Sequence, residues 1–369
     1  QIFILGNKMI LISLLGKYDS SIFPILFEFK TQIKMHIIIH DDSRYETKKV
    51  NNIIDSQEKF KKFFSLDYKN YAIKIDEDSY TDILNCYEQI AKLANNDFEN
   101  IYFNGTGGLV SSTIILSNKL LEKGSSFIAY DIFDNGYNIV SKDSMQKKRI
   151  NENKDIYTHF LLKGYELLSS GNKIEAYKRK NIVLKLCENL ENFQNFATLI
   201  QNKNSEQING FSNIKELLFK IDKLDDKMFI QGTIFEEYIY WLIEDNFDFD
   251  QVMFNAKVQF AENLMNEFDI LMIKDNHLHV IECKLRKAVP GEHYVYKLDS
   301  VIDYLDDDGK GMIVVIGAEN HQITNSGKSK VSFTNGTISR ANNANIKIHH
   351  FKTFDKNKFL EDIKKHFLN

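Results

Sequence analysis

The sequence is poor in cysteine and proline, and it contains no long apolar run. Its 369 residues include three cysteines and two prolines. Cys86, Cys187 and Cys283 are odd in number and far apart, which argues against a disulfide framework or a zinc site and predicts a reducing, cytoplasmic setting. No apolar run approaches the ~20 residues of a membrane-spanning helix, so we expect no membrane partner.

A strong charge of one sign is also absent. The formal net charge is −4, so no global basic field indicates nucleic acid, and a nucleic-acid enzyme would need a local basic groove. The start of the chain is apolar but lacks the charged flank and the cleavage site of a signal peptide. Met9 is a natural candidate for the first residue, which leaves the origin of residues 1–8 open. The length and the 43% of apolar residues suit two or three packed domains.

The N-terminal third alternates short β-branched runs with helical periodicity. Strands are predicted at residues 9–15, 34–40, 71–75, 100–103 and 125–130, and helices at residues 22–31, 47–64, 79–93 and 109–123. This alternation predicts a parallel α/β sheet with right-handed crossovers. A hairpin with Asn135-Gly136 as its turn is predicted to close the sheet.

The rest of the chain changes character twice. Residues 155–225 carry helical spacing, and apolar positions from Phe160 to Leu168 predict one helix. The last third alternates helices with apolar strands again. We therefore expect three parts: an α/β domain at residues 1–145, a mainly helical connector at 146–225 and a second α/β domain at 226–369.

Charged residues gather in a predicted hairpin near residue 275. Residues 270–273 and 277–281 flank a polar turn, which predicts two paired strands. Residues two apart on a strand share a face, so Glu282 and Lys284 point the same way and Asp269 reaches them from the neighbouring strand. Two carboxylates and an ammonium in apolar strands are costly unless a metal or a reaction needs them.

These residue types suit the metal-dependent hydrolysis of a phosphodiester. Asp269 and Glu282, helped by the backbone carbonyl of Cys283, would hold Mg²⁺ or Mn²⁺, since oxygen ligands suit these ions better than zinc. Lys284 would orient or deprotonate the water, or stabilise the phosphorane charge. Glu236, on the helix before the sheet, can add a carboxylate.

The same residues also allow non-catalytic interpretations. The hairpin face can simply be solvated and carry a surface Glu–Lys pair. Glu237 is expected to be solvated, and Cys283 to fill the core, because no histidine is placed as its base. His277 and His279 are interpreted as ordinary strand residues rather than metal ligands.

A glycine-rich turn, Asn104-Gly105-Thr106-Gly107-Gly108, joins a predicted strand to a predicted helix. Backbone N–H groups in such a turn can cradle phosphate or another anion. The turn lacks the full Gly-x-Gly-x-x-Gly spacing and a following Lys-Ser/Thr pair, so a dinucleotide or Walker-type site is not supported. A tight turn whose glycines only let the helix pack close to the strand is equally compatible.

The pattern Asp269-x12-Glu282-Cys283-Lys284 resembles the PD-(D/E)xK core of the restriction-endonuclease-like superfamily, with Phe268 in place of the proline. In such nucleases the helix after the lysine often adds a polar residue, for which Lys297 is the candidate. A Rossmann-like domain with the turn at 104–108, joined to such a core, resembles the CRISPR-associated Rossmann-fold (CARF) nucleases of type III CRISPR systems.

This resemblance implies a homodimer whose paired CARF domains bind one cyclic oligoadenylate, most simply cyclic tetra-adenylate. It implies metal-dependent nicking of DNA and cutting of single-stranded DNA or RNA in antiviral defence. Relatives often place a lysine two residues after the double glycine, where this chain has Val110. The ligand residues carried over are Ser13, Gly16, Asp19, Asn104, Gly105, Thr106, Gly107 and Gly108.

Two other functions stay open at this point. The chain can be a CARF-type sensor or transcription regulator with an inactive nuclease-like domain, although the intact Glu282-Cys283-Lys284 argues against it. It can also be a small-molecule α/β enzyme that uses the glycine-rich turn as its active site. The ring size of the activator, the choice between DNA and RNA, the metal, and any slow degradation of the ligand by the CARF site also stay open.

Overall fold

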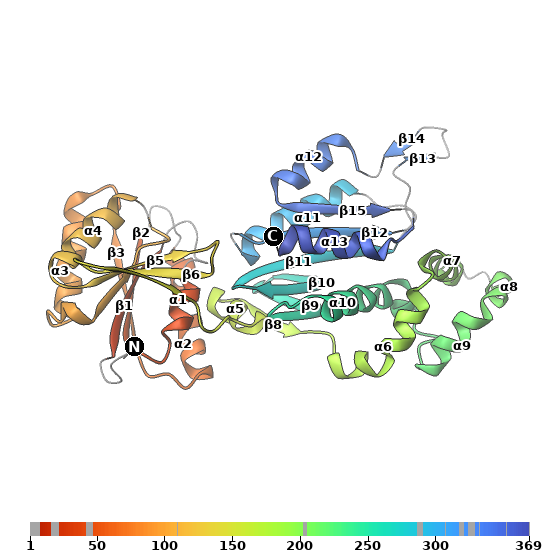
Figure 1. Ribbon diagram of the computed structural model, residues 1–369, viewed down its shortest axis with the longest axis horizontal. Helices are drawn as coiled ribbons and strands as arrows, with labels where there is room; N and C mark the ends of the chain where they lie inside the picture. Colours follow the sequence, from red (N-terminus) through yellow and green to blue (C-terminus); the bar gives the residue numbers. More distant parts are fainter. Residues whose placement is uncertain are drawn as a thin grey trace. The chain divides into compact units, whose positions relative to one another are not determined.

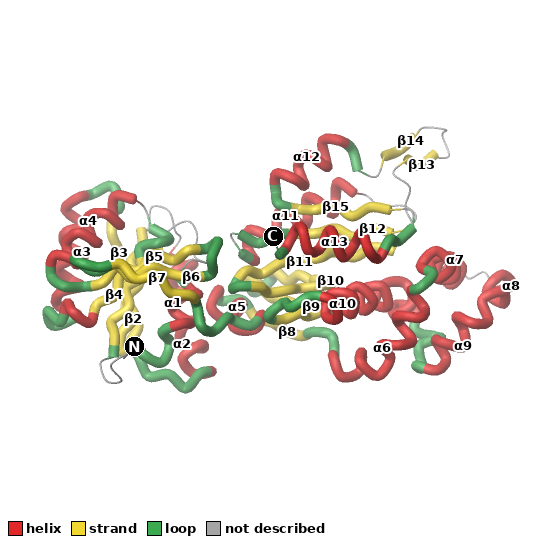
Figure 2. Tube along the Cα trace, viewed as in Figure 1, coloured by secondary structure: helices red, strands yellow, loops and turns green. Residues whose placement is uncertain are grey.

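The computed structural model describes residues 8–15, 22–41, 47–108, 110–201, 205–285, 291–306, 308–316, 321–323, 329–331, 333–351 and 353–368. The chain divides into two compact units, residues 1–166 and residues 167–369 (Figures 1 and 2). Each unit is built on its own β-sheet. The predicted division into three parts stays a prediction.

A seven-stranded sheet in the order β3-β2-β1-β4-β5-β6-β7 forms the first unit. Strands β1 to β5 run parallel, and β6 and β7 are antiparallel additions. The strands are β1 (Met9–Leu15), β2 (Ile33–Asp41), β3 (Lys69–Ile75), β4 (Ile101–Asn104), β5 (Ser126–Asp131), β6 (Gly136–Val140) and β7 (Met145–Arg149). The predicted parallel α/β sheet is confirmed. The predicted hairpin also forms, between β5 and β6, but its turn covers residues 132–135 and Gly136 already belongs to β6.

Helices cover both faces of this sheet (Figure 1). One face carries α1 (Phe23–Glu28), α2 (Thr47–Phe63) and α5 (Ile156–Lys163), and the other carries α3 (Tyr80–Leu93) and α4 (Val110–Glu122); a short 3₁₀ helix spans Phe98–Asn100. Apolar residues at helical spacing explain this packing: α3 starts at its cap Ser79 and buries Ile83, Cys86 and Ile90.

The single helix predicted from Phe160 to Leu168 is wrong in its second half. Helix α5 ends because Gly164 adopts a left-handed φ of 78°, a conformation that closes helices and that glycine adopts without strain. The chain then enters β8 (Glu166–Ser169), which belongs to the second sheet.

The second sheet has six strands in the order β15-β12-β11-β10-β9-β8. Its centre is an antiparallel meander of β9 (Gln251–Ala261), β10 (Leu264–Lys274) and β11 (His277–Leu285). Strands β12 (Gly311–Ile316) and β15 (Ile346–Phe351) continue it in parallel, while β13 (His321–Ile323) and β14 (Ser329–Val331) pair separately. The predicted hairpin of the charged residues is therefore β10–β11, with Asp275 and Asn276 in its turn at positive φ.

Helices again pack on both faces of the second sheet. One face carries α6 (Lys173–Cys187), α10 (Ile234–Asn246) and α13 (Lys356–Phe367). The other carries α11 (Gly291–Leu305), whose Leu298 and Ile302 contact Gly311, and α12 (Asn335–Asn343). The remaining helices are α7 (Leu190–Gln201), α8 (Ser205–Ile208), a 3₁₀ turn (Asn209–Phe211), α9 (Ser212–Lys220) and a π-helix (Phe229–Thr233) that leads into α10. Among the described helices, none has both the length and the apolar character needed to span a bilayer.

Candidate functional site

Strands β10 and β11 bring the predicted charged residues together. Their register pairs Ile270 with Ile281, so Asp269 comes to lie opposite Glu282, one step further along. The Nζ atom of Lys284 lies 3.0 Å from Asp269 Oδ2 and 2.7 Å from Glu282 Oε1. The three side chains thus form one contact cluster, as their spacing predicted, while their catalytic roles stay predictions.

The Lys284 ammonium touches all three oxygen groups that the sequence assigns to a metal. Besides the two carboxylates, it donates to the backbone carbonyl of Cys283 at 2.9 Å. Asp269 Oδ2 also accepts the N–H of Cys283 at 2.7 Å, which fixes that carboxylate in place. Oxygen atoms that converge on one ammonium can also face one hard divalent cation, so this donor set fits Mg²⁺ or Mn²⁺.

The candidate metal site supplies few protein ligands. No group of three or more His, Cys, Asp or Glu side chains in the described part of the chain is arranged to hold a metal ion. Asp269 and Glu282 would therefore act with the Cys283 carbonyl and with water. Mg²⁺ commonly binds in this way, through one or two carboxylates while it keeps several waters.

Burial governs the charges of the cluster. Asp269 and Glu282 are 8% and 6% exposed. Burial, reinforced by the Glu282 charge, raises the pKa of Asp269. Burial lowers the pKa of Lys284, but Asp269 and Glu282 outweigh it and hold that pKa above its usual value. A firmly protonated Lys284 suits charge stabilisation better than it suits proton abstraction.

Glu236, in the first turn of α10, interacts electrostatically with the same cluster. Burial, followed by the charge of Asp269, raises the pKa of Glu236 to about 8. Its Oε1 lies 3.6 Å from the point where a Cβ on Gly232 would stand, so it faces back over the π-helix. Such π-helical turns recur at functional sites because they change which residues face a neighbour.

The expectation that Glu237 is solvated is wrong. Glu237 is fully buried and forms a two-pronged ion pair with Arg179 of α6. Arg179 Nε donates to Glu237 Oε2 at 2.9 Å, and Nη2 donates to Oε1. The two partners lie 58 residues apart in the sequence, so no local sequence pattern predicts this ion pair. Adjacent glutamates on α10 thus serve different neighbours, Glu236 the charged cluster and Glu237 the helix α6.

Helix α11 adds two side chains from the other face of the sheet. Lys297 Nζ lies 3.6 Å from Glu282 Oε2, so the predicted residue does approach the cluster. The ring of Tyr294 lies 5.4 Å from Lys284 Nζ, a cation–π distance. Sequence reasoning missed Tyr294; its spacing of three residues from Lys297 is the signal that could have found it.

The neighbouring cysteine and histidine are core residues. Burial raises the pKa of the Cys283 thiol well above its usual value, so it is a poor nucleophile. His279 is buried, its Nδ1 accepts the N–H of Lys310 at 3.2 Å, and burial lowers its pKa to about 3. Both interpretations made from the sequence agree with this geometry.

In the first unit, the glycine-rich turn is tied down by its polar residues. Asn104 Oδ1 accepts from Thr106 Oγ1 at 2.7 Å, and Thr106 Oγ1 accepts the N–H of Tyr130 at 2.9 Å. A Cβ on Gly105 would lie 2.8 Å from the ring of Phe127, and a Cβ on Gly108 only 2.0 Å from Leu14. Close packing alone therefore demands both glycines, and a ligand role for residues 104–108, Gly107 included, stays a prediction.

Ser13 lies beside this turn, paired with Asn104 in the sheet, and is fully buried. Its Oγ is 2.9 Å from His36 Nε2, and His36 Nδ1 is 2.8 Å from Gln57 Oε1. An amide oxygen only accepts, so His36 carries its proton on Nδ1, and its Nε2 accepts a hydrogen bond from the Ser13 hydroxyl. Burial lowers the pKa of His36 to about 4, which keeps it neutral. The other two predicted residues of this loop, Gly16 and Asp19, lie outside the described residues.

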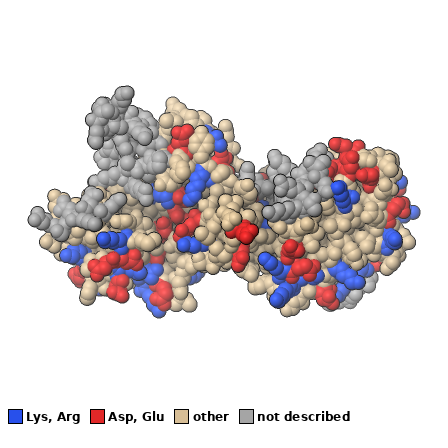
Figure 3. Space-filling view, turned by 180° about the vertical axis from the view of Figure 1, so that it is seen from behind, with Lys and Arg blue, Asp and Glu red and all other residues tan. Residues whose placement is uncertain are grey.

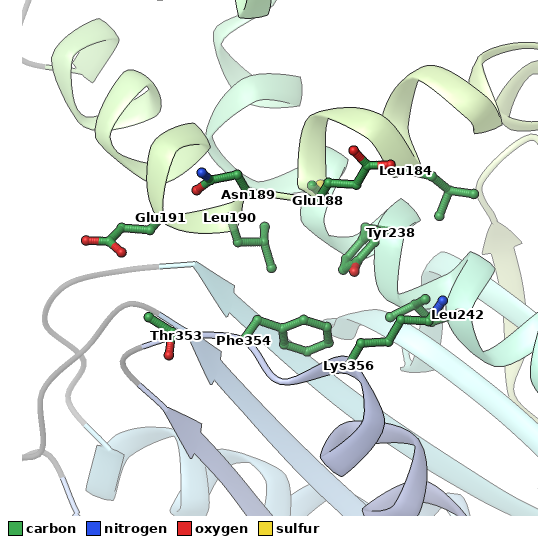
Figure 4. Close-up of a pocket in the computed structure, with 11 residues that line it drawn as sticks. Leu184, Glu188, Asn189, Leu190, Glu191, Tyr238, Leu242, Thr353, Phe354 and Lys356 are labelled. Carbon is green, nitrogen blue, oxygen red and sulfur yellow. The ribbon is translucent and has the colours of Figure 1, made fainter.

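The second unit also holds a cavity of about 530 Å³ beside α10 (Figure 4). The rings of Tyr238 and Phe354 lie side by side in its lining, with their centroids 5.6 Å apart (Figure 4). The lining residues are Leu184, Cys187, Glu188, Asn189, Leu190, Glu191, Tyr238, Leu242, Thr353, Phe354 and Lys356. None belongs to the charged cluster, so this cavity is separate from the candidate catalytic centre.

The face of the molecule shown in Figure 3 carries charges of both signs. In Figure 3, lysine and arginine alternate with aspartate and glutamate over the face that is shown. This mixture agrees with the net charge of −4.

Known proteins share this architecture. Residues 222–348 match the Card1-like endonuclease domain family. Protein VC1899 from Vibrio cholerae matches with a TM-score of 0.72 and 15% identity over 97% of both chains. Can2 from Sulfobacillus thermosulfidooxidans, solved in complex with cyclic tetra-adenylate, matches with a TM-score of 0.70 and 15% identity over 96% of this chain and 98% of that one.

A third solved structure is more distant. It is a type III CRISPR defence DNA nuclease activated by cyclic oligoadenylate, with a TM-score of 0.54 and 9% identity over 85% of this chain and 46% of that one. No curated protein sequence gives a significant match. The predicted resemblance is confirmed for the fold and for the endonuclease domain, which contains Glu236, Asp269, Glu282, Lys284 and Lys297.

Proposed function

We propose that this chain, whose residues 222–348 form a Card1-like endonuclease domain, is a metal-dependent endonuclease of type III CRISPR defence that a cyclic oligoadenylate activates. The observation that carries the proposal is the buried contact cluster of Asp269, Glu282 and Lys284 inside that domain. Such a cluster in an apolar sheet is costly without a cation or a reaction to use it.

The residues of the cluster divide the chemistry between them. Asp269, Glu282 and the Cys283 carbonyl would hold Mg²⁺ or Mn²⁺, which supplies charge neutralisation and an activated water when bound. Lys284 stays charged and stabilises the negative charge that grows on the phosphate. Glu236, with a pKa of about 8, is suited to exchange a proton near neutral pH.

The first unit would supply the switch. Ligands of open α/β sheets bind beyond the carboxyl ends of the strands, where β1 and β4 place Ser13 and the turn at 104–108. The shared fold with Can2, which was solved with cyclic tetra-adenylate, supports that ring as the activator. In a homodimer, the ligand would be cradled by both copies and would favour the cleaving state.

The proposed substrate range rests on how nucleic-acid sequence is recognised. Sequence-specific recognition requires an element that reads base edges, and no such element stands out among the described ones. We therefore propose nicking of duplex DNA and cutting of single-stranded DNA or RNA with little sequence preference.

Cleavage assays test this function. Supercoiled plasmid, single-stranded DNA and RNA are incubated with the protein and Mn²⁺, with and without cyclic tetra-adenylate. We expect cleavage only with the ligand, and a loss of about 100-fold or more in Asp269→Ala, Glu282→Ala and Lys284→Ala. Lys274→Ala, on the same hairpin but beside Asp250, is the matched control and should cleave normally.

Titration calorimetry separates the two halves of the proposal. The three inactive variants should still bind cyclic tetra-adenylate. Retained cutting in all three would refute the site assignment, and cutting that ignores the ligand, together with no heat of binding, would refute the gating. Ligand binding without cleavage of any substrate would instead favour a sensor.

A further inference from the structure

Asn255 has a backbone conformation that strand residues rarely adopt. Its φ is 49°, in the left-handed region, although it lies in the interior of β9. Every other non-glycine residue with positive φ in the described part of the chain lies in a turn. The left-handed region is strained for an L-residue, although asparagine tolerates it best. Strained residues of this kind cluster at functional sites, where the surrounding structure holds them.

The strand register places this residue at the candidate site. Strands β9 and β10 pair Phe254 with Ile270 and Ala256 with Phe268, which brings Asn255 and Asp269 to the same level of the two strands. Asp269 in turn lies opposite Glu282 on β11. Asn255, Asp269 and Glu282 therefore form one row across three neighbouring strands.

The side chain of Asn255 is available for a ligand. It is only half-buried, and its amide makes no hydrogen bond to any other described residue. The backbone next to it is held firmly: Gly171 N–H donates to the carbonyl of Phe254 at 2.7 Å. A Cβ on Gly171 would lie 2.2 Å from the Phe254 ring, so the approach is as close as glycine permits. The strained residue is thus fixed in place with an unused amide.

We infer that Asn255 is a further residue of the endonuclease site and that its Nδ2 amide donates a hydrogen bond to a non-bridging oxygen of the substrate phosphate. The inference rests on the proposed function. A phosphodiester that approaches Asp269 and Glu282 meets two carboxylates, which repel its oxygens. A neutral amide in the same row donates to a phosphate oxygen without competing for a divalent cation.

A purely structural explanation makes the opposite prediction. A left-handed residue can serve only to bend β9 where Phe254 packs against Gly171. Glycine adopts this conformation without strain. If bending were the only role, Asn255→Gly would improve the fold and leave cleavage unchanged. If the amide binds substrate, the same variant keeps its fold and loses activity.

The test compares full-length variants in plasmid nicking with Mn²⁺ and cyclic tetra-adenylate. We expect Asn255→Gly to melt no lower than wild type while its kcat falls by about 100-fold, the usual effect of removing one donor to a growing negative charge. Asn345→Gly is the matched control, because Asn345 has a φ of 53° in a turn far along the chain; its kcat should not change. Asn255→Asp keeps a residue that tolerates the backbone but replaces the donor with a carboxylate, and should be at least as slow.

The outcomes separate this inference from the proposed function. Asn255→Gly and Asn255→Asp with kcat within twofold of wild type would overturn the inference, while Asp269→Ala still abolished cutting and upheld the nuclease. A wild-type protein that cuts none of the substrates would overturn both. If Asn255→Gly melted lower than wild type, its kcat would not be interpretable. The kcat of Asn255→Asp, measured on a protein that melts like wild type, would then decide between the two explanations.

Discussion

One ammonium group balances the candidate site. Lys284 lies within 3.0 Å of Asp269, Glu282 and the Cys283 carbonyl. It therefore neutralises part of the carboxylate charge when no divalent cation is near. A bound cation would compete with it for the same oxygens and would free the ammonium to turn towards a phosphate. The group that stabilises the folded site would then also be the group that assists the proposed cleavage.

Glu236 offers a test of this electrostatic picture through stability. Its pKa is raised from 4.5 to about 8 by burial and then by Asp269. The folded state thus holds a proton that the unfolded state has lost, so stability falls as the pH rises from about 4.5 to about 8. We expect Glu236→Gln, with chelator present, to raise the free energy of unfolding by about 1–3 kcal/mol at pH 9 and hardly at pH 4. Urea unfolding across this range measures it, and parallel pH curves for variant and wild type would contradict it.

At the scale of residues, the sequence predicts the site residues that belong to one short motif. The spacing of Asp269, Glu282 and Lys284 was sufficient because strand alternation and a short hairpin place them on one face. Arg179 and Glu237 could not be paired, since their contact depends on how α6 packs on α10. Asn255 gave no signal at all, because its distinguishing property is a backbone angle.

At the scale of elements, the sequence predicts those with an apolar pattern and misses strands that lack one. Helix α3 and strand β1 have clear apolar patterns, and both are predicted from the sequence. Strand β7 reads Met-Gln-Lys-Lys-Arg and is almost wholly exposed, so no apolar alternation marks it. Strand β8 was hidden in an apparent helical pattern that only the left-handed Gly164 interrupts. In both cases the neighbouring strand, rather than the local sequence, determines the structure.

The pairing of α6 with α10 can be tested by its buried ion pair. Arg179→Met leaves the fully buried Glu237 without its partner and should cost about 3 kcal/mol in the free energy of unfolding. The double variant Arg179→Met with Glu237→Met should recover to within about 1 kcal/mol of wild type. Lys178→Met, which removes an exposed pair with Glu175 on the same helix, is the control and should cost less than about 0.5 kcal/mol. Urea denaturation of the four proteins gives these values, and equal losses in the single and double variants would contradict the argument.

At the scale of the whole molecule, the matched family boundary and the physical boundary differ. The endonuclease match begins at residue 222, but the second compact unit begins at residue 167. The residues in between supply strand β8, which covers the edge of β9, and helix α6, which covers α10. The N-terminal part of this unit therefore belongs to the nuclease core as a folding unit.

Two fragments distinguish these boundaries. We expect residues 167–369 to fold as a monodisperse protein with a cooperative thermal transition. Residues 222–369 would expose the edge of β9 and the apolar side of α10, and should aggregate. Size-exclusion chromatography and circular dichroism melting compare them. A stable, monodisperse shorter fragment would show that β8 and α6 are dispensable.

The packing of Gly108 has a consequence for evolutionary comparison. A Cβ there would lie 2.0 Å from Leu14, so selection for a stable fold alone would preserve this glycine in every homologue. Its invariance among related sequences would carry no information on whether a lineage still recognises a signalling nucleotide. Divergence in recognition should instead be recorded at outward-facing positions of the same segment, such as Val110, which is 73% exposed.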